Sequence, residues 1–518
     1  MRILLQNLTR FGDLLQSQPT LAELAGAGHE VAVACLENFA GAAALLPEAS
    51  ALFPLPGARF LAELDRDWHQ ALVAISEYAD HVSQQFAPDA IINLTPALAA
   101  RLLARRLHGD AVQGFSLDPL GYRHESSLWA TFLEASSTRR GLSPFNIVDL
   151  FRKAAGGGQG RGQFCLRRPD AQEQAESRSR LEGQAPAATT FFVGFQLGAS
   201  AAARQWPVDF FARLGELLWE QLGAVPVLLG GAGEKALAMR YRDLCAAPSV
   251  DLIGETTLSQ LAAVLCQLRL LVTNDTGTMH LAAGLDIPCA AVFLATAQPF
   301  DTGPYREGCL CLEPDMPCHP CPFGTACPHD NACLTAIGVE TMFASVADFC
   351  QNGRFPAGCY PGARAWLSAF DASGFMDLYS LSGHDAEPRA AWLRLERQVL
   401  RQFLDEEPLH LATTAVPVLP EALRESLRGI LGQSADLLRL LEGQAVLAAR
   451  TPAMKSRFLA SWERLRTLWL HSPYLGVLAY LWMQEAQEAA PDLERLLTRI
   501  RRFGSCVEIL TVSVHRMC

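Results

Sequence analysis

Residues 268–291, which read LRLLVTNDTGTMHLAAGLDIPCAA, constrain the fold more than any other stretch of the chain. The apolar run at 270–272 is typical of a strand buried on both faces, and 289–294 is typical of the next strand. Between them, residues 274–277 are turn and N-cap types, and 279–284 predict a helix. Strand, tight polar turn, helix and strand together indicate an α/β fold with a parallel sheet.

The predicted helix after Thr276 points unpaired backbone N–H groups at the mouth of the sheet. These groups carry a partial positive charge, so an anion fits there, and a phosphate fits best. His280 lies in the first helical turn and can reach the same anion. Asn-Asp-Thr-Gly is also an ordinary helix start, and the tetrapeptide alone does not separate the two interpretations.

The same alternation of strands and helices begins at residue 191. Predicted strands are 191–195, 225–229 and 250–253, and predicted helices are 209–222, 234–244 and 258–265. Repeated βα units imply a parallel sheet with right-handed crossovers, so the loops after successive strands meet at one edge. These loops carry Ser200, Arg204, Glu234 and Thr256. An arginine neutralises phosphate charge, and small residues let the backbone approach a ligand closely. A carboxylate binds a sugar hydroxyl, so the set favours a nucleotide diphosphate as ligand.

Residues 1–155 show a similar rhythm, with predicted strands at 3–5, 31–35 and 90–94, and indicate a first doubly wound domain. Asp13 follows the first strand, where open α/β sheets bind their ligands. It is also a suitable N-cap for the next helix, and both interpretations stay open.

The remaining boundaries follow from changes in composition. Residues 156–188 are rich in Gly and charged residues and read as a linker. Residues 189–345 form the second domain, and residues 346–518 read as an extension of amphipathic helices. Those helices either pack on one another and on the body of the protein, or dock a partner or a membrane surface.

Length and charge limit the classes of function. A chain of 518 residues suits two or three domains. The net charge of −11 opposes nucleic acid as the main partner, because phosphate contacts need a basic field. No apolar stretch approaches the roughly 18 residues of a membrane span. The N-terminus reads as a strand rather than a signal peptide, so we expect a cytoplasmic protein with mostly reduced thiols.

A cysteine cluster follows the second domain's strands. Its spacing is C-x2-C-x5-C-x5-C, formed by Cys318, Cys321, Cys327 and Cys333. Thiolates at short spacing can hold zinc or an iron–sulfur cluster, although the second pair lacks a tight C-x2-C. Packed or oxidised thiols are the alternative.

Taken together, the loop motifs resemble the heptosyltransferase family of bacterial enzymes, glycosyltransferase family 9, from about residue 1 to 345. The matching residues are Gly12-Asp13, Gly198-Ala199-Ser200 with Arg204-Gln205-Trp206-Pro207, Gly230-Gly231 with Glu234, Thr256-Thr257-Leu258, and the run from Asn274 to His280. The D-T-G-x-x-H element together with Trp-Pro is specific. Leu197 and Thr278 depart from the family pattern, and Arg204 replaces its lysine.

The resemblance implies the GT-B fold, in which two Rossmann-like domains face each other across a cleft. It implies inverting transfer without metal or cofactor, with Asp13 as general base and Arg204 stabilising the leaving diphosphate. Glu234 would contact the ribose. The other donor-site positions would be Ser200, Thr256, Asp275, Thr276, Gly277, Thr278 and His280.

The expected reaction moves a sugar, heptose in most family members, from an ADP-sugar to a lipopolysaccharide core or related glycan. The partners are then a nucleotide-sugar donor and a glycan or glycolipid acceptor, with peripheral contact to the inner membrane face left open. Two alternatives remain: a nucleotide-sugar epimerase or hydrolase on the same fold, and a non-catalytic scaffold with a degenerate transferase body. The sequence leaves the oligomeric state open.

Overall fold

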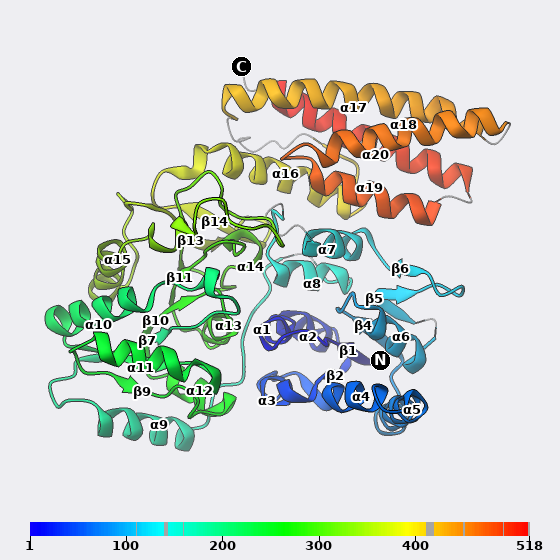
Figure 1. Cartoon of the computed structure of the whole chain (residues 1–518). Helices are drawn as coiled ribbons and strands as arrows, with labels where there is room; N and C mark the ends of the chain where they lie inside the picture. Colours follow the sequence, from blue (N-terminus) through cyan, green and yellow to red (C-terminus); the bar gives the residue numbers. More distant parts are fainter. Residues whose placement is uncertain are drawn as a thin grey trace. The chain divides into compact units, whose positions relative to one another are not determined.

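The computed structural model describes residues 1–109, 111–138, 143–158, 160–410, 419–448, 451–489 and 492–515 of the chain drawn in Figure 1. It divides into two compact units. The first unit comprises Met1–Arg123 and Phe145–Ser382, and the second comprises His124–Pro144 and Gly383–Cys518. None of the helices in the described ranges combines the length and apolar character that a membrane crossing requires.

The first part of unit 1 is a parallel sheet in the order β3-β2-β1-β4-β5. Its strands are β1 (Arg2–Gln6), β2 (Glu30–Leu36), β3 (Ala49–Leu55), β4 (Ala90–Asn93) and β5 (Val112–Leu117). Central β1 is buried from Ile3 onward, as an apolar strand covered on both faces must be. The helices are α1 (Phe11–Leu15), α2 (Gln18–Gly26), α3 (Ala40–Ala43), α4 (Gly57–Leu64), α5 (Trp68–Gln85), α6 (Leu98–Leu107) and α8 (Ile147–Ala154).

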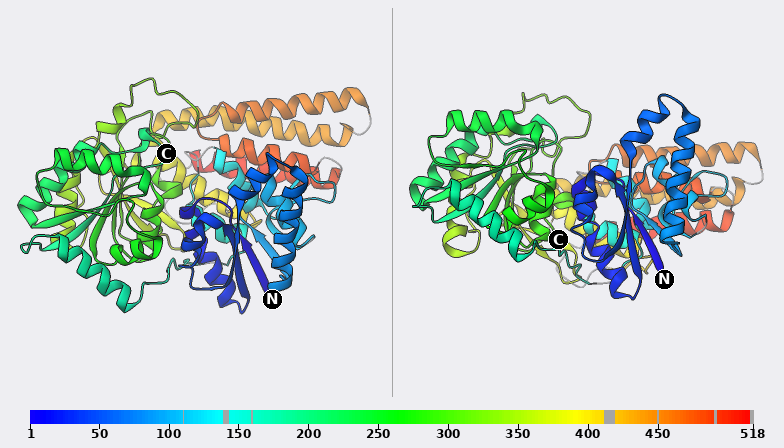
Figure 2. Two further views of the ribbon diagram at one scale, coloured as in Figure 1. Left: turned by 60° about the horizontal axis from the view of Figure 1, so that its bottom comes forward. Right: turned by 90° about the horizontal axis from the view of Figure 1, so that it is seen from below.

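The second part of unit 1 is a sheet in the order β14-β13-β12-β11-β10-β7-β8-β9. The parallel strands are β7 (Phe191–Gln196), β8 (Ala224–Leu229), β9 (Val250–Asp251), β10 (Leu268–Asn274), β11 (Cys289–Val292) and β12 (Leu310–Pro314). The helices are α9 (Ala171–Gln184), α10 (Val208–Leu222), α11 (Lys235–Leu244), α12 (Leu258–Leu265), α13 (Gly277–Gly284), α14 (Pro299–Thr302) and α15 (Val339–Asn352). Both views in Figure 2 show strands enclosed between helices.

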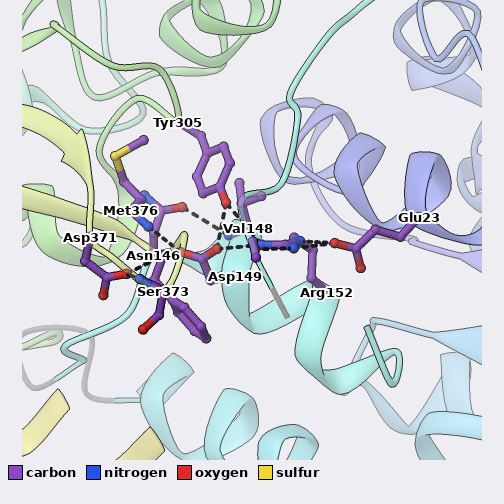
Figure 3. A network of polar contacts seen from close by, with 11 residues as sticks. Glu23, Asn146, Val148, Asp149, Arg152, Tyr305, Asp371, Ser373 and Met376 are labelled. Carbon is purple, nitrogen blue, oxygen red and sulfur yellow. Dashed lines mark hydrogen bonds and ion pairs between the residues drawn. The ribbon is translucent and has the colours of Figure 1, made fainter. Parts of the chain in front are cut away.

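Helix α8 joins the two parts of unit 1 through a buried polar network (Figure 3). Its Asp149 accepts hydrogen bonds from the Tyr305 hydroxyl at 2.7 Å and from the Met376 backbone N–H at 2.9 Å. Its Arg152 pairs with Asp149 and with Glu23 of α2. Asp149 and Arg152, one turn apart in α8, therefore bind α2 of the first part and two segments of the second part of unit 1.

Among its described residues, the second unit is helical apart from the end of β6 (Arg123–Glu125). Its helices are α7 (Leu128–Thr138), α16 (Pro388–Leu404), α17 (Glu421–Ala448), α18 (Pro452–Leu470), α19 (Gly476–Ala489) and α20 (Leu493–His515). Trp129 of α7 donates to Asp405 at 2.8 Å, which ties α7 to helices nearly three hundred residues later. Buried Trp469 donates to the hydroxyl of Ser434 at 2.8 Å.

Two segments differ from the boundaries expected from the sequence. The predicted linker 156–188 contains α9, which starts at a capping box between Asp170 and Glu173. The predicted helical extension from residue 346 first forms β13 (Ala363–Phe370) and β14 (Met376–Ser380), an antiparallel hairpin that pairs with β12. The hairpin covers the edge of the second sheet, so the helical unit begins only at Gly383.

Candidate active site

The site is built at the carboxyl edge of the second sheet, where the loops after β7, β8, β9 and β10 meet. The short turn after β7 carries Ser200 and Arg204. The turn after β8 carries Glu234, and the turn after β9 carries Thr256. Helix α13 begins after β10 at Gly277 and carries Thr278 and His280 in its first turns. The loop positions expected from the sequence are thus brought to one edge.

Arg204 is held in a fixed direction inside this edge. Its guanidinium donates to the Ser200 hydroxyl at 3.1 Å and forms an ion pair with Asp275. The paired side chains of Arg204 and Asp275 are only 10% and 8% exposed. Nε of Arg204 is buried and has no hydrogen-bond partner within the described ranges. A pre-oriented, largely desolvated guanidinium suits a phosphate oxygen.

The Trp-Pro element that follows Arg204 locks this loop to the rest of the unit. The backbone N–H of Trp206 donates to Asn274 Oδ1 at 2.8 Å, and the indole N–H donates to the Ile337 carbonyl at 2.9 Å. The Asn274 amide in turn donates to the carbonyls of residues 196, 197 and 198 at 3.0 to 3.3 Å. Asn274, directly before Asp275, therefore joins the turns after β7 and β10 by hydrogen bonds.

Glu234 lies in a recess lined by glycines. A Cβ on Gly198 would lie 1.5 Å from Oε1 of Glu234, and a Cβ on Gly230 would lie 2.2 Å from Oε2. The N–H of Gly231 donates to Oε2 at 2.8 Å. The glycines of both turns are therefore required so that this carboxylate can approach the backbone.

The start of α13 meets α1 from the first part of the unit. Thr276 is the N-cap of α13, with extended backbone angles. A Cβ on Gly277 would lie 2.0 Å from the Phe11 ring, and a Cβ on Gly12 would lie 3.1 Å from the His280 ring. The two helices are thus in direct contact, which brings Gly12, the residue before Asp13 in α1, to the N-terminus of α13.

The N-cap interpretation of Asp13 is wrong. Helix α1 begins at Phe11 with Arg10 as its N-cap, so Asp13 lies inside the helix. The Asp13 backbone carbonyl accepts a hydrogen bond from the Asn7 side chain at 3.1 Å. The Asp13 side chain is half-buried in the first turn of α1. A carboxylate in this position can act as a general base.

The family model for glycosyltransferase family 9 (heptosyltransferase) matches residues 88–331, which include every candidate loop of the second sheet. Within these residues the chain is similar to glycosyltransferase family 9. The family match begins after α1, so Asp13 lies outside the matched residues.

Curated heptosyltransferases are also similar to part of the chain. Over 130 residues the chain is 32% identical to lipopolysaccharide heptosyltransferase 1 of Pseudomonas aeruginosa, covering 25% of this chain and 36% of that protein. The chain thus spans about a third of the length of the curated relatives it matches.

Two solved structures share the fold. The family-9 glycosyl transferase of Veillonella parvula is 18% identical with a TM-score of 0.56, covering 68% of this chain and 97% of that one. The E. coli ADP-heptose lps heptosyltransferase II is 16% identical with a TM-score of 0.50, covering 68% and 99%. Both support the α/β architecture of two sheets.

The remaining expected donor-site position, Thr256, lies in the turn before α12. The next residue, Thr257, is the N-cap of that helix and forms a capping box with Gln260. The N–H of Gly254 donates to the Gly230 carbonyl at 2.9 Å. This bond fixes the Thr256 turn beside the glycine turn that precedes Glu234.

One polar residue of the site was missed from the sequence. Gln196, the last residue of β7, is 4% exposed. Its amide nitrogen lies 3.3 Å from Glu234 Oε2, and its amide oxygen accepts a hydrogen bond of 2.9 Å from Thr278 Oγ1. The available signal was a single glutamine at the end of an otherwise apolar strand.

The cysteine cluster lies in the loop between β12 and α15. The N–H groups of His329 and Asn331 each donate to the Cys327 sulfur at 3.4 Å. Burial raises the pKa of Cys321 and of Cys333, and neighbouring thiols raise it further. Within the described ranges no three of the cluster's sulfurs lie within 4.8 Å of one another.

Proposed function

We propose that the chain is an inverting glycosyltransferase that moves a heptose from an ADP-sugar to a lipopolysaccharide core or related glycan, without a metal ion. The observation that carries the proposal is the convergence of a pre-oriented arginine, a recessed carboxylate and the α13 N-terminus at one sheet edge of a chain similar to family 9. The printed name of the E. coli structural neighbour, an ADP-heptose lps heptosyltransferase, supports the choice of donor.

In this proposal the diphosphate of the donor lies at the start of α13. Arg204 supplies a guanidinium N–H, and the free backbone N–H groups of the first helical turn supply further donors. Glu234 accepts from the ribose hydroxyls. Ser200, Thr256, Asp275, Thr276, Gly277, Thr278 and His280 complete the donor site. These groups stabilise the negative charge that develops as the bond to the diphosphate breaks.

Asp13 is the proposed general base. It takes the proton from the acceptor hydroxyl while that oxygen attacks the anomeric carbon, from the face opposite the departing diphosphate. The new C–O bond forms as the bond between the anomeric carbon and the phosphate oxygen breaks, so the configuration inverts and ADP leaves with both electrons. The contact between α1 and α13 supports this pairing of base and donor.

The acceptor in this proposal is a lipid-linked glycan. We place the reaction at the cytoplasmic face of the membrane, where peripheral contact would present the glycolipid to the acceptor side of unit 1. A vesicle flotation assay with the purified full chain, with and without a lipopolysaccharide precursor, tests this placement. Recovery of the chain only in the soluble fraction under both conditions would contradict it.

Binding of ADP, UDP, GDP and CMP, measured as the thermal shift each nucleotide induces, tests the donor site. We expect a selective shift with ADP that falls sharply in Arg204→Ala and partly in Arg204→Lys, each compared with its own ligand-free protein. Arg213→Ala, on the exposed face of α10, is the control. A selective shift with another nucleotide would replace the donor, and no shift at all would favour the scaffold alternative.

Asp13→Asn tests the base. With ADP-heptose and a core acceptor, we expect normal donor binding and a turnover reduced by about 100-fold or more. Full turnover in this variant would remove Asp13 from the mechanism. Analysis of the products without acceptor separates the transferase from an epimerase or hydrolase, because only the latter two would consume the donor.

A further inference from the structure

Gln196 connects two parts of the donor site that come from distant segments. Its amide nitrogen faces the Glu234 carboxylate, at 3.3 Å from Oε2 and 3.5 Å from Oε1. Its amide oxygen accepts from the Thr278 hydroxyl at 2.9 Å. A side-chain amide can donate to a carboxylate through its nitrogen and accept from a hydroxyl through its oxygen at the same time.

Within the described part of the chain, Glu234 has few other hydrogen-bond partners. The Gly231 N–H binds only Oε2, and the absent side chains of Gly198 and Gly230 provide space but no hydrogen bond. The Gln196 amide is the side-chain donor that reaches both carboxylate oxygens. Since a hydrogen bond to a charged group is stronger than a neutral one, this contact and the Gly231 N–H together set the direction in which the carboxylate points.

Thr278 is the residue that the Gln196 amide oxygen contacts, opposite Glu234. It lies in the first turn of α13, which begins at Gly277, and its side chain is nearly buried. Because Gln196 is at the end of a central strand, it cannot move freely toward either partner. The amide therefore fixes the distance between the carboxylate and the helix N-terminus.

We propose that Gln196 is a positioning residue that aims Glu234 at the ribose hydroxyls of the nucleotide and couples this contact to the α13 N-terminus that receives the diphosphate. The inference rests on the proposed function, because it requires that a nucleotide diphosphate binds at this edge. It assigns to Gln196 the discrimination between ribose and a sugar without hydroxyls.

Calorimetric titration of the full chain with ADP and with 2′,3′-dideoxy-ADP tests this role. We expect the wild-type protein to bind ADP more tightly than the dideoxy nucleotide by about tenfold or more, the effect of one or two hydrogen bonds to a carboxylate. In Gln196→Leu this ratio should fall to about twofold, while the affinity for the dideoxy nucleotide changes little. Gln221→Leu, on the exposed side of α10, is the control.

The ratio of the two affinities separates a positioning role from a structural one. A general defect in Gln196→Leu would weaken both nucleotides equally and keep the wild-type ratio, and this result would overturn the proposal. Gln196→Met provides the same readout if the leucine variant does not fold. In a Glu234→Gln background the Gln196 substitution should have no further effect on the ratio. If the wild-type chain binds neither nucleotide, the proposed function fails and this inference with it, whereas an unchanged ratio in a binding-competent variant refutes the inference alone.

Discussion

The hydroxyl of Tyr305 donates a hydrogen bond of 2.7 Å to Asp149, a carboxylate 156 positions earlier in the chain. Both side chains are buried, and Arg152 adds an ion pair to the same carboxylate. Burial raises the pKa of Tyr305, and the adjacent Asp149 raises it further, so the phenol stays a donor over the range of ordinary buffers. The pair joins α8 to the loop before β12.

Tyr305→Phe should therefore destabilise unit 1. The substitution leaves a buried carboxylate with one donor fewer, which costs about 1–3 kcal/mol of unfolding free energy. Urea unfolding followed by tryptophan fluorescence measures the change. Tyr122→Phe is the matched control, because that ring is 70% exposed. Equal effects of the two substitutions would show that the Asp149 contact adds nothing to stability.

The glycine recess around Glu234 gives a second prediction. In Gly198→Ala the new Cβ would lie 1.5 Å from Glu234 Oε1, so the carboxylate must turn away. We expect ADP affinity to fall by about tenfold or more, the loss of a hydrogen bond to a charged group. Gly231→Ala is the control, since a Cβ there meets nothing within 4 Å. Calorimetry that finds the two variants indistinguishable would place Glu234 outside the nucleotide site.

Several of the strands that are buried on both faces were predictable, although β12, which is buried along its whole length, was not. Residues 225–229 and 270–273 read as apolar runs and lie in β8 and β10. When helical segments alternate with such runs, the runs indicate buried strands rather than buried helix segments. The loop residues could be assigned to one edge because parallel strands all end on the same side.

Other features leave no local trace in the sequence. Gln196 contacts Glu234 and Thr278, which are 38 and 82 positions away, and no period or motif connects them. The hairpin of β13 and β14 was read as part of a helical extension. Its burial depends on pairing with β12, about fifty residues earlier, and pairing between distant segments is invisible to a windowed pattern.

The contact between α1 and α13 predicts a loss of turnover in Gly277→Ala. A Cβ at this position would lie 2.0 Å from the Phe11 ring, so the ring must move, and we expect α1 with its Asp13 to shift away from the donor site. A displacement of about 1 Å can reduce a rate by up to about 100-fold. We expect kcat to fall more than ADP affinity, in assays with donor and acceptor.

Two further variants check the cause of this loss. Phe11→Ala combined with Gly277→Ala makes room for the new methyl group and should restore part of kcat. Gly233→Ala, where a Cβ meets nothing within 4 Å, should behave as wild type. If the double variant is as slow as Gly277→Ala alone, displacement of α1 is not the reason for the loss.

The helical unit carries a buried acid that should make its stability depend on pH. Glu396 of α16 is 2% exposed, and its Oε1 has no hydrogen-bond partner within the described ranges. Burial raises its pKa well above the ordinary value. Because the folded-state pKa is raised, the stability that protonated Glu396 contributes is fully present below the unfolded pKa of about 4.3. It is lost as pH rises toward the folded-state pKa.

The side chain of Glu396→Gln stays neutral at every pH. The unfolding free energy of this variant should therefore rise relative to wild type by about 1.4 kcal/mol per pH unit across that window. Urea unfolding at a series of pH values from 4 to 8 measures the difference, with exposed Glu425→Gln as control. Parallel stability curves for wild type and Glu396→Gln would mean that Glu396 is ionised in the folded protein.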